Sequence, residues 1–468
     1  MDTTGQDLVK RIANLVRQNQ DLIKDNETLK DKLKDLKTEL EFYKKGFSGS
    51  KSDLIKGKIL VEKASPLRFD IATVMFANIH GFENIEDGMN TVEVMDDLDH
   101  ILFQFDEILK KYKIQKIKTI GDTIMAAGGV PNKNITNPVD VIMAAIEMQN
   151  FLKEHCDKNS QKKKIWELKI GIHTGPVTAT TSGKKKITYD IKGDVVNMAT
   201  RMQSYTFDGA ILISVMTYEL TKEFFQCEYF GKMPVKYKAD LEIYKVKALK
   251  PEFSLNDEGT KPNESFGIKF KLIQFNDIQE IILDKLEKEL PAYLYYHNVK
   301  HTVDVVTEVE LMGWAESVTD EEILLLKTAG LFHDAGHTVA YDEHEYHGTV
   351  MAHEMLPEFG YTEEQINRIC DIIMATKLPP KPKDLLQKII CDADLDYLGR
   401  SDMIPVSNTL YKELHEQNKI GTLDDWNKLQ IMFISGHQYF TQTARSLREV
   451  NKQKQIERIK SLLPEEKE

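Results

Sequence analysis

The chain opens with apolar residues at alternating spacings of three and four, continued from Leu8 to Tyr43 over five heptads. Leucine fills nearly every d position, while Asn19 and Asn26 fall at a positions. Buried asparagines at a positions cost stability, but they pair across a two-stranded coiled coil and fix its register and parallel orientation. We therefore predict a parallel, dimeric coiled coil over residues 1–46, in preference to one amphipathic helix lying on its own domain, and a linker at 47–65.

Residues 66–250 alternate between the periods of strands and helices. Strands are predicted at 69–79, 114–120, 122–128 and 166–173, and helices at 91–112, at 137–156 and from about Asp194. This order predicts an α/β or α+β sandwich.

The remaining chain changes character twice. Residues 251–268 are rich in proline, glycine and polar side chains and are expected to form a second linker. Residues 269–468 have helical spacing with no strand pattern, which predicts an all-α bundle. The chain is thus expected to be multidomain.

Composition narrows the function classes. The 468 residues include 62 basic and 74 acidic side chains, for a net charge of −12, so extended nucleic acid is an unexpected partner. No apolar run reaches the roughly 20 residues needed to span a bilayer, and no secretory signal is evident at the start. The four cysteines show no CxxC spacing. We expect a cytoplasmic protein without a membrane partner.

Histidines and aspartates recur in the C-terminal half in the motifs YHNVKH (296–301), HDAGH (333–337) and CDAD (391–394). Adjacent His and Asp are unusual in a core, because a buried carboxylate is costly unless it is paired or bound to metal. His297 and His301, like His333 and His337, are four residues apart and would share one helix face. Imidazoles and carboxylates suit divalent metals and proton transfer. The pattern predicts a hydrolase site.

Four segments of the middle region resemble the class III adenylyl and guanylyl cyclases: FANIHGF (76–82), KIKTIGDTIMA (116–126), GIHTGP (171–176) and YDIKGDVVNMATRM (189–202). The resemblance implies a dimeric enzyme that converts a nucleoside triphosphate to a cyclic nucleotide with Mg²⁺ or Mn²⁺. It assigns metal binding to Asp122 and to the position of Asn78, and substrate contacts to Gly81 and Phe82.

The same resemblance assigns the remaining nucleotide contacts. Lys118 and Asp190 would read the base, where this pair favours adenine and hence ATP. Asn197 would orient the ribose, Arg201 would meet the phosphate, and Lys238 would bind the triphosphate.

Asn78 stands where the cyclase family has its first metal-binding aspartate. An amide oxygen can ligate a metal but carries no charge, so two cations would be held by one fewer anion. Two hypotheses follow. One is an adenylyl cyclase weakened by Asn78, and the other is a pseudo-cyclase that senses nucleotide and gates the C-terminal domain.

The C-terminal motifs resemble the HD superfamily of phosphohydrolases, and further the helical cyclic-nucleotide phosphodiesterases. The resemblance implies two divalent metals, such as Zn²⁺, Mg²⁺, Mn²⁺ or iron, on His301, His333, Asp334 and Asp394, with Asp392 as the alternative to Asp394. His297 would be the general acid, and outer-shell support would come from His337, Glu345 and His347. Singly, the later histidines such as His344 are expected to be surface or packing residues.

Together these features predict a cyclic-nucleotide signalling protein. The glutamine and apolar clamp that hold the base in animal phosphodiesterases cannot be located in the sequence, so hydrolysis of a phosphate ester is predicted more firmly than cyclic AMP as the substrate. The expected partners are ATP, a cyclic nucleotide and a second copy of the chain.

Overall fold

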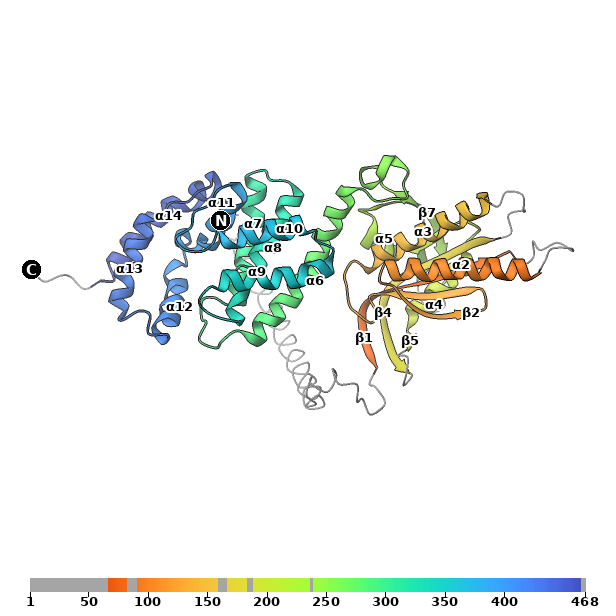
Figure 1. Cartoon of the computed structure of the whole chain (residues 1–468), viewed down its shortest axis with the longest axis horizontal. Coiled ribbons are helices and arrows are strands. Elements are labelled where there is room, and N and C mark those ends of the chain that lie inside the picture. The colour runs from red at the N-terminus through yellow and green to blue at the C-terminus, as the bar shows by residue number, and fades with distance from the viewer. Residues whose placement is uncertain (1–65, 82–90, 159–165, 183–187, 236–238, 464–468) are drawn as a thin grey trace, which may run out of the picture. The chain divides into compact units, whose positions relative to one another are not determined.

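The described residues form a sheet domain and a helical region (Figure 1). The structure, a computed structural model, describes residues 66–81, 91–158, 166–182, 188–235 and 239–463. The predicted coiled coil at 1–46 and linker at 47–65 lie outside these residues.

An eight-stranded sheet organises the first domain. Its strands are β1 (Leu67–His80), β2 (Gln115–Ile120), β3 (Thr123–Gly128), β4 (Glu167–Ser182), β5 (Thr188–Lys192), β6 (Ile211–Ser214), β7 (Phe225–Met233) and β8 (Leu241–Leu249). The order is β2-β3-β1-β4-β6-β8-β7, and β5 pairs with β4. The pairing of β4 with β6 is parallel, whereas β1 is antiparallel to both of its neighbours.

Helices pack on the two faces of the sheet, as the alternation along β1 requires. Met75, Ala77 and Ile79 join one core with α2 (Thr91–Lys111) and α3 (Asn137–Lys158). Val74 and Phe76 point to the other face, in a cluster that includes residues of α4 (Asp194–Tyr205). The short helix α5 (Val215–Thr221) follows β6. The α+β sandwich predicted from the sequence is confirmed.

Close approach of α4 to the sheet depends on a glycine in β4. A Cβ at Gly171 would lie 2.2 Å from the backbone nitrogen of Gln203. Only glycine therefore lets the helix that carries Asn197 and Arg201 pack at this distance.

The second region is helical, and residues 264–463 contain no strand. Its helices are α6 (Glu264–Glu289), α7 (Val299–Ala315), α8 (Asp320–Phe332), α9 (His344–Met355), α10 (Glu363–Met374), α11 (Leu385–Asp394), α12 (Met403–Glu416), α13 (Leu423–Gly436) and α14 (Gln442–Lys460), with 3-10 helices η4 (Ala335–Thr338), η5 (Leu356–Phe359) and η6 (Asp396–Gly399). The all-α prediction is confirmed. None of the helices that the structure describes is both long enough and apolar enough to cross a membrane.

The segment expected as a linker, 251–268, is folded instead. It contains η2 (Pro251–Phe253), η3 (Leu255–Asp257) and the first residues of α6. The Asn263 side chain caps α6 by accepting a hydrogen bond from the backbone N–H of Phe266 at 3.0 Å. Phe266 belongs to the core of the sheet domain and Phe275 to that of the helical region, so α6 contributes to both.

Candidate functional site

Four ligand atoms converge where three helices of the second region meet. His301 comes from the first turn of α7, His333 and Asp334 directly follow α8, and Asp394 is the last residue of α11. The Nε2 atom of His301 lies 3.1 Å from Asp394 Oδ1, 3.4 Å from Asp334 Oδ2 and 3.3 Å from His333 Nε2. His333 Nε2 lies 3.3 Å from Asp334 Oδ2 and 3.6 Å from Asp394 Oδ1.

These separations match the ligands of one small cation. Tetrahedral ligands about 2.1 Å from an ion lie roughly 3.4 Å from one another. His333 Nδ1 donates to the carbonyl of Gly330 at 2.8 Å, which fixes the tautomer and leaves the Nε2 lone pair facing the cluster. Asp394, rather than Asp392, completes the set.

Electrostatics also favour a cation at this point. Burial lowers the pKa of His333, but Asp334 and Asp394 raise it more, so the pKa ends well above its ordinary value. Burial raises the pKa of Asp394, but His301 and His333 lower it by more, so its pKa ends below the ordinary value. Two buried carboxylates thus need positive charge beside them, which protons or a metal ion can supply.

A second group of ligands lies on the other side of Asp334. Asp334 Oδ1 is 3.5 Å from His344 Nε2 and 3.9 Å from His337 Nε2. Both ring nitrogens of His337 are buried without a hydrogen-bond partner among the described residues. Burial, the largest effect, lowers the pKa of His337 to about 3, which keeps this imidazole neutral and its lone pair available. Orphaned buried donors of this kind fit a second cation.

His344 and Glu345 of α9 extend this second group. His344 Nε2 lies 3.5 Å from Glu345 Oε1, and the His344 ring stacks on the His337 ring with centroids 3.9 Å apart. From the sequence His344 is expected to be a surface or packing residue, because only the packing of α9 against η4 brings it to Asp334.

That packing depends on two glycines. A Cβ at Gly336 would lie 1.9 Å from the carbonyl oxygen of His344, and one at Gly348 would lie 2.4 Å from that of Phe332. We expect Gly336→Ala to displace α9 and to lower the metal content of the purified protein, measured by elemental analysis. Gly267→Ala in α6, where a Cβ meets nothing within 4 Å, is the matched control. Unchanged metal content in Gly336→Ala would contradict the role of this contact.

The predicted general acid, His297, is held by a residue that the sequence did not indicate. Glu413 on α12 is fully buried and accepts a hydrogen bond from His297 Nδ1 at 2.5 Å. It also accepts the backbone N–H groups of Tyr296 and His297 at 3.0 and 3.2 Å. Burial raises the pKa of Glu413, but His297 and these donors lower it below its ordinary value of 4.5. The stability this carboxylate contributes is therefore present above pH 4.5 and is lost as the pH falls through the lowered pKa.

Asp392 has a different task. Its carboxylate accepts hydrogen bonds from the backbone N–H of Phe440 at 2.9 Å, and from the backbone N–H and hydroxyl of Thr441, both at 2.7 Å. Asp392 therefore anchors the turn before α14 and is not directed at the histidines.

Two cavities of about 260 Å³ border the metal-ligand cluster, and Tyr296, Asp394 and Tyr397 line both. The first, which we call the apolar cavity, is lined by Tyr296, His297, Leu378, Asp394, Leu395, Tyr397, Leu398, Leu410, Leu414, Trp426, Leu429, Gln430, Phe433 and Ile434. Within it, Gln430 Oε1 accepts a hydrogen bond from Ser407 at 2.5 Å, and Ser407 Oγ accepts one from Trp426 Nε1 at 3.1 Å. These bonds fix the orientation of the glutamine amide and leave its Nε2 as a donor.

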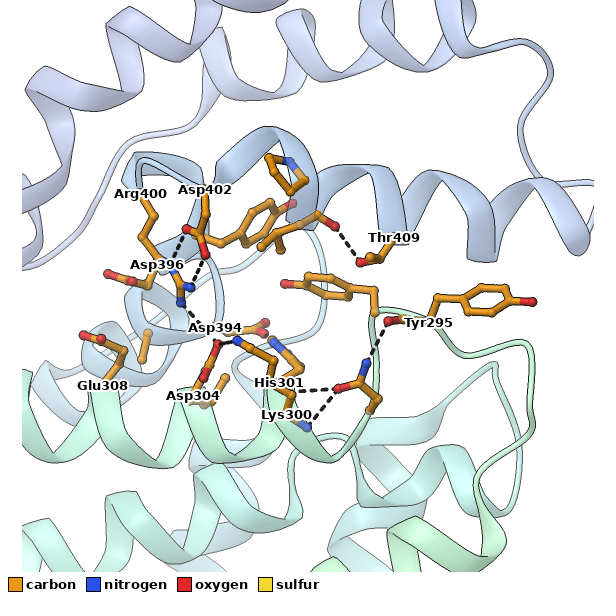
Figure 2. Close-up of a pocket in the computed structure, with 17 residues that line it drawn as sticks. Tyr295, Lys300, His301, Asp304, Glu308, Asp394, Asp396, Arg400, Asp402 and Thr409 are labelled. Atoms are coloured by element: carbon orange, nitrogen blue, oxygen red, sulfur yellow. Dashed lines mark hydrogen bonds and ion pairs between the residues drawn. The ribbon is translucent and has the colours of Figure 1, made fainter. Parts of the chain in front are cut away.

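The second, charged cavity lies between α7 and the η6–α12 segment (Figure 2). Arg400 bridges Asp304 at 3.2 Å and Asp402 at 2.6 Å. Behind it, Arg448 pairs with the buried Asp396 at 2.5 Å and lies 3.7 Å from Glu308. Burial raises the pKa of Asp396, because the ion pair only partly offsets desolvation.

Arg448 is expected to be a strong contributor to stability. Arg448→Leu leaves Asp396 buried and unpaired, which should lower the free energy of unfolding by about 3–5 kcal/mol. The loss should be larger at pH 8 than at pH 5, because the raised pKa lets protonation relieve the buried charge at low pH. Urea unfolding at both pH values tests this, with the exposed Arg458→Leu as control. Equal losses in the two variants would contradict it.

In the sheet domain, the predicted nucleotide residues lie at strand ends and on α4. Lys118 of β2 and Asp190 of β5 face each other, with Nζ 3.4 Å from Oδ1, and both are half exposed. Asn78 at the end of β1 lies beside Asp122 in the turn between β2 and β3. Asn197 and Arg201 are exposed one turn apart on α4, and Gly81 follows β1. Phe82 and Lys238 lie outside the described residues.

Comparisons with known proteins agree with this division. Residues 65–248 match the adenylate and guanylate cyclase catalytic domain, and residues 298–396 match the HD domain. The receptor-type guanylate cyclase gcy-8 of Caenorhabditis elegans is 33% identical over 193 residues, which cover 40% of this chain and 17% of that protein. The adenylate cyclase of Mycobacterium bovis is 32% identical over 177 residues, covering 38% of this chain and 39% of that enzyme. This chain therefore spans less than half of either relative.

A solved structure, the adenylyl cyclase CyaB from P. aeruginosa, is 29% identical and covers 42% of this chain and 100% of that one, with a TM-score of 0.37. The resemblances found in the sequence are confirmed by the two family matches. The chain joins an adenylate and guanylate cyclase catalytic domain at residues 65–248 to an HD domain at residues 298–396.

Proposed function

We propose that the chain is a cyclic-nucleotide signalling enzyme whose HD domain hydrolyses a nucleotide phosphodiester with the help of divalent metal ions. The observation that carries the proposal is the set of four ligand atoms on His301, His333, Asp334 and Asp394, separated by 3.1–3.6 Å. The unpaired ring nitrogens of His337, with Asp334 Oδ1 3.9 Å from His337 Nε2, fit a second ion. When bound, a metal pair of this kind polarises the phosphoryl group and supplies a hydroxide nucleophile.

The protein's own contribution to bond cleavage is proton transfer to the leaving oxygen. The His297 ring lies beside the His337 ring, with centroids 4.7 Å apart, while Glu413 accepts the Nδ1 hydrogen bond. Because Nδ1–H is donated to Glu413, the acid form is the imidazolium, and its second proton, on Nε2, is the one that passes to the leaving oxygen. Glu413 orients the ring and pairs with its positive charge. A ribose oxygen is a poor leaving group unless it is protonated, so this step matters most for nucleotide esters.

The apolar cavity supports a nucleobase as the substrate's recognition group. It adjoins Asp394 and His297, and its lining offers flat apolar contacts from Leu398 and Phe433. The fixed Gln430 amide adds one directional donor, which suits an acceptor on a purine edge. The base-holding glutamine that could not be found in the sequence is thus proposed to be Gln430.

For the cyclase domain two functions remain candidates. One is weak conversion of ATP to cyclic AMP with Mg²⁺ or Mn²⁺, in a homodimer held by the coiled coil and by the cyclase domains. The other is a nucleotide sensor that gates the HD site, for which α6 is the natural connection because it belongs to both cores. The hydrogen bonds from Asn78 to Asp122 and Thr123 favour the sensor.

One assay tests both domains. Purified full-length protein is incubated with cyclic AMP or cyclic GMP, and separately with ATP or GTP, in Mg²⁺ or Mn²⁺, and products are separated by chromatography. We expect metal-dependent conversion of a cyclic nucleotide to the linear monophosphate. Failure to hydrolyse either cyclic nucleotide in any metal would refute the proposed substrate class. Accumulation of cyclic AMP from ATP when the HD site is inactivated would establish the cyclase alternative.

A further inference from the structure

Asn78 occupies the position of a metal ligand but acts as a hydrogen-bond donor. Its Nδ2 atom lies 2.7 Å from Asp122 Oδ1 and 2.8 Å from Thr123 Oγ1. The Thr123 hydroxyl also lies 3.2 Å from Asp122 Oδ1. Oδ1 of Asp122 therefore already accepts hydrogen bonds from Asn78 of β1 and Thr123 of β3.

The partners assign the orientation of this amide. Turning it over would place the Asn78 carbonyl oxygen against the Asp122 carboxylate, where two acceptors face each other. The backbone adds a further constraint, because Ile79 N–H donates to the Asp122 carbonyl at 2.9 Å and Asn78 pairs with Thr123 in the sheet register. A metal ion between the two side chains would have to displace the hydrogen bond from the Asn78 amide to Asp122. In exchange the ion would meet one carboxylate instead of the two that it meets in the cyclase family. The residues at this position do not fit the metal pair of the cyclase family.

We infer that the cyclase-domain site binds an adenine nucleotide without holding a metal ion of its own, and therefore favours one of low phosphate charge, such as a cyclic or linear monophosphate. The inference rests on the nucleotide-sensor function proposed above, with Lys118 and Asp190, 3.4 Å apart, as the residues that the cyclase resemblance assigns to the base. At this site the Asn78 amide N–H group donates to Asp122, where a metal ion would bind in an active cyclase.

Charge decides which nucleotide fits. An amide hydrogen bond satisfies Asp122 but leaves its negative charge in place. A triphosphate brought to this end of the sheet would meet that charge with no bridging cation, whereas a monophosphate brings less charge to repel. The ligand class so defined coincides with the substrate or product proposed for the HD site, which would let the domain report on the chemistry of its neighbour.

The test compares binding of cyclic AMP and of ATP by full-length protein, each in Mg²⁺ and in EDTA, by titration calorimetry. All proteins carry His333→Ala, so that the HD site does not consume the cyclic nucleotide. Parallel titrations with Lys118→Ala identify the share of binding that belongs to the cyclase-domain site. The matched variant is Asn78→Asp, which changes one amide to a carboxylate.

With Asn78 present, Lys118-dependent binding of cyclic AMP should differ by less than about threefold between Mg²⁺ and EDTA and should exceed that of ATP. In Asn78→Asp, Mg²⁺ should strengthen ATP binding by about tenfold or more, because two carboxylates then face one cation. A Mg²⁺ requirement in the protein with Asn78, or a preference for ATP, would overturn the inference while leaving nucleotide binding in place. Absence of any Lys118-dependent nucleotide binding would refute the proposed site as well.

A nucleotide-free measurement keeps the idea testable if Asn78→Asp folds poorly. Without metal, the carboxylate that Asn78→Asp introduces lies within hydrogen-bond distance of the Asp122 carboxylate and repels it. The Tm of this variant should therefore fall below that of the parent. Mg²⁺ should narrow this Tm difference. Ions bound at the HD site raise the Tm of both proteins equally, so they do not change the difference. A Tm difference that Mg²⁺ leaves unchanged would show that Asn78 does not decide metal binding.

Discussion

Asp334→Asn is expected to reduce hydrolysis at least about 10³-fold, equivalent to roughly 4 kcal/mol of transition-state stabilisation. Asp334 reaches both groups of candidate ligands, with Oδ2 toward His301 and His333 and Oδ1 toward His344. An amide in its place removes the negative charge from both cation positions while keeping the shape of the side chain. The measurement is the steady-state rate with a cyclic nucleotide, together with the metal content of the purified protein.

Asp371→Asn is the matched control, because it makes the same chemical change at an exposed position on α10. It should retain full activity and metal content. If Asp334→Asn instead hydrolysed its substrate within threefold of the parent, the HD motif would not be the reaction centre.

Glu413→Gln is expected to lower kcat for a cyclic nucleotide by about 10²-fold with little change in KM. Glutamine keeps an acceptor for the backbone N–H groups of Tyr296 and His297, but it removes the negative charge that holds His297 Nδ1. The imidazole then loses its orientation and the partner of its protonated form. His297→Gln should have an effect of similar size on the same substrate, because both changes remove proton transfer to the leaving oxygen.

The leaving group separates this role from a structural one. Bis(p-nitrophenyl) phosphate releases a phenolate that needs no protonation, so Glu413→Gln and His297→Gln should slow its hydrolysis by less than about threefold. Glu416 is an exposed carboxylate on the same helix as Glu413, and it accepts a hydrogen bond from the Tyr295 hydroxyl. Glu416→Gln should change the hydrolysis rate of neither substrate. If Glu413→Gln lowered the hydrolysis rate equally for both substrates, the site would have lost its structure, and a positioning role would be contradicted.

The sequence located strands β1 to β4 and helices α2 to α4 because their signals are local, whereas it predicted no strand for β5 to β8. The strand predicted at 69–79 is β1 (Leu67–His80), and the helix predicted at 137–156 is α3 (Asn137–Lys158). Period-2 and period-3.6 patterns record which face of an element is buried, and that requires no knowledge of its neighbours. The segment 251–268 was expected to be a linker because of its polar composition. Composition alone does not show that Asn263 caps α6 or that Phe266 of this helix is buried.

The HD and cyclase motifs likewise lie in short, contiguous runs, and these runs by themselves determined the two domain types. They also predicted His301, His333 and Asp334 as candidate metal ligands, with Asp394 or Asp392 as the fourth. Only the tertiary structure decided between Asp394 and Asp392, since both belong to one four-residue motif and differ in what packs against them. Only packing brought Glu413 to His297 across 116 residues and His344 to Asp334 through the contact at Gly336. The hydrogen bond from Asn78 to Asp122 joins residues 44 apart. A short motif specifies the chemistry available, but the distances between side chains from different elements depend on how those elements pack.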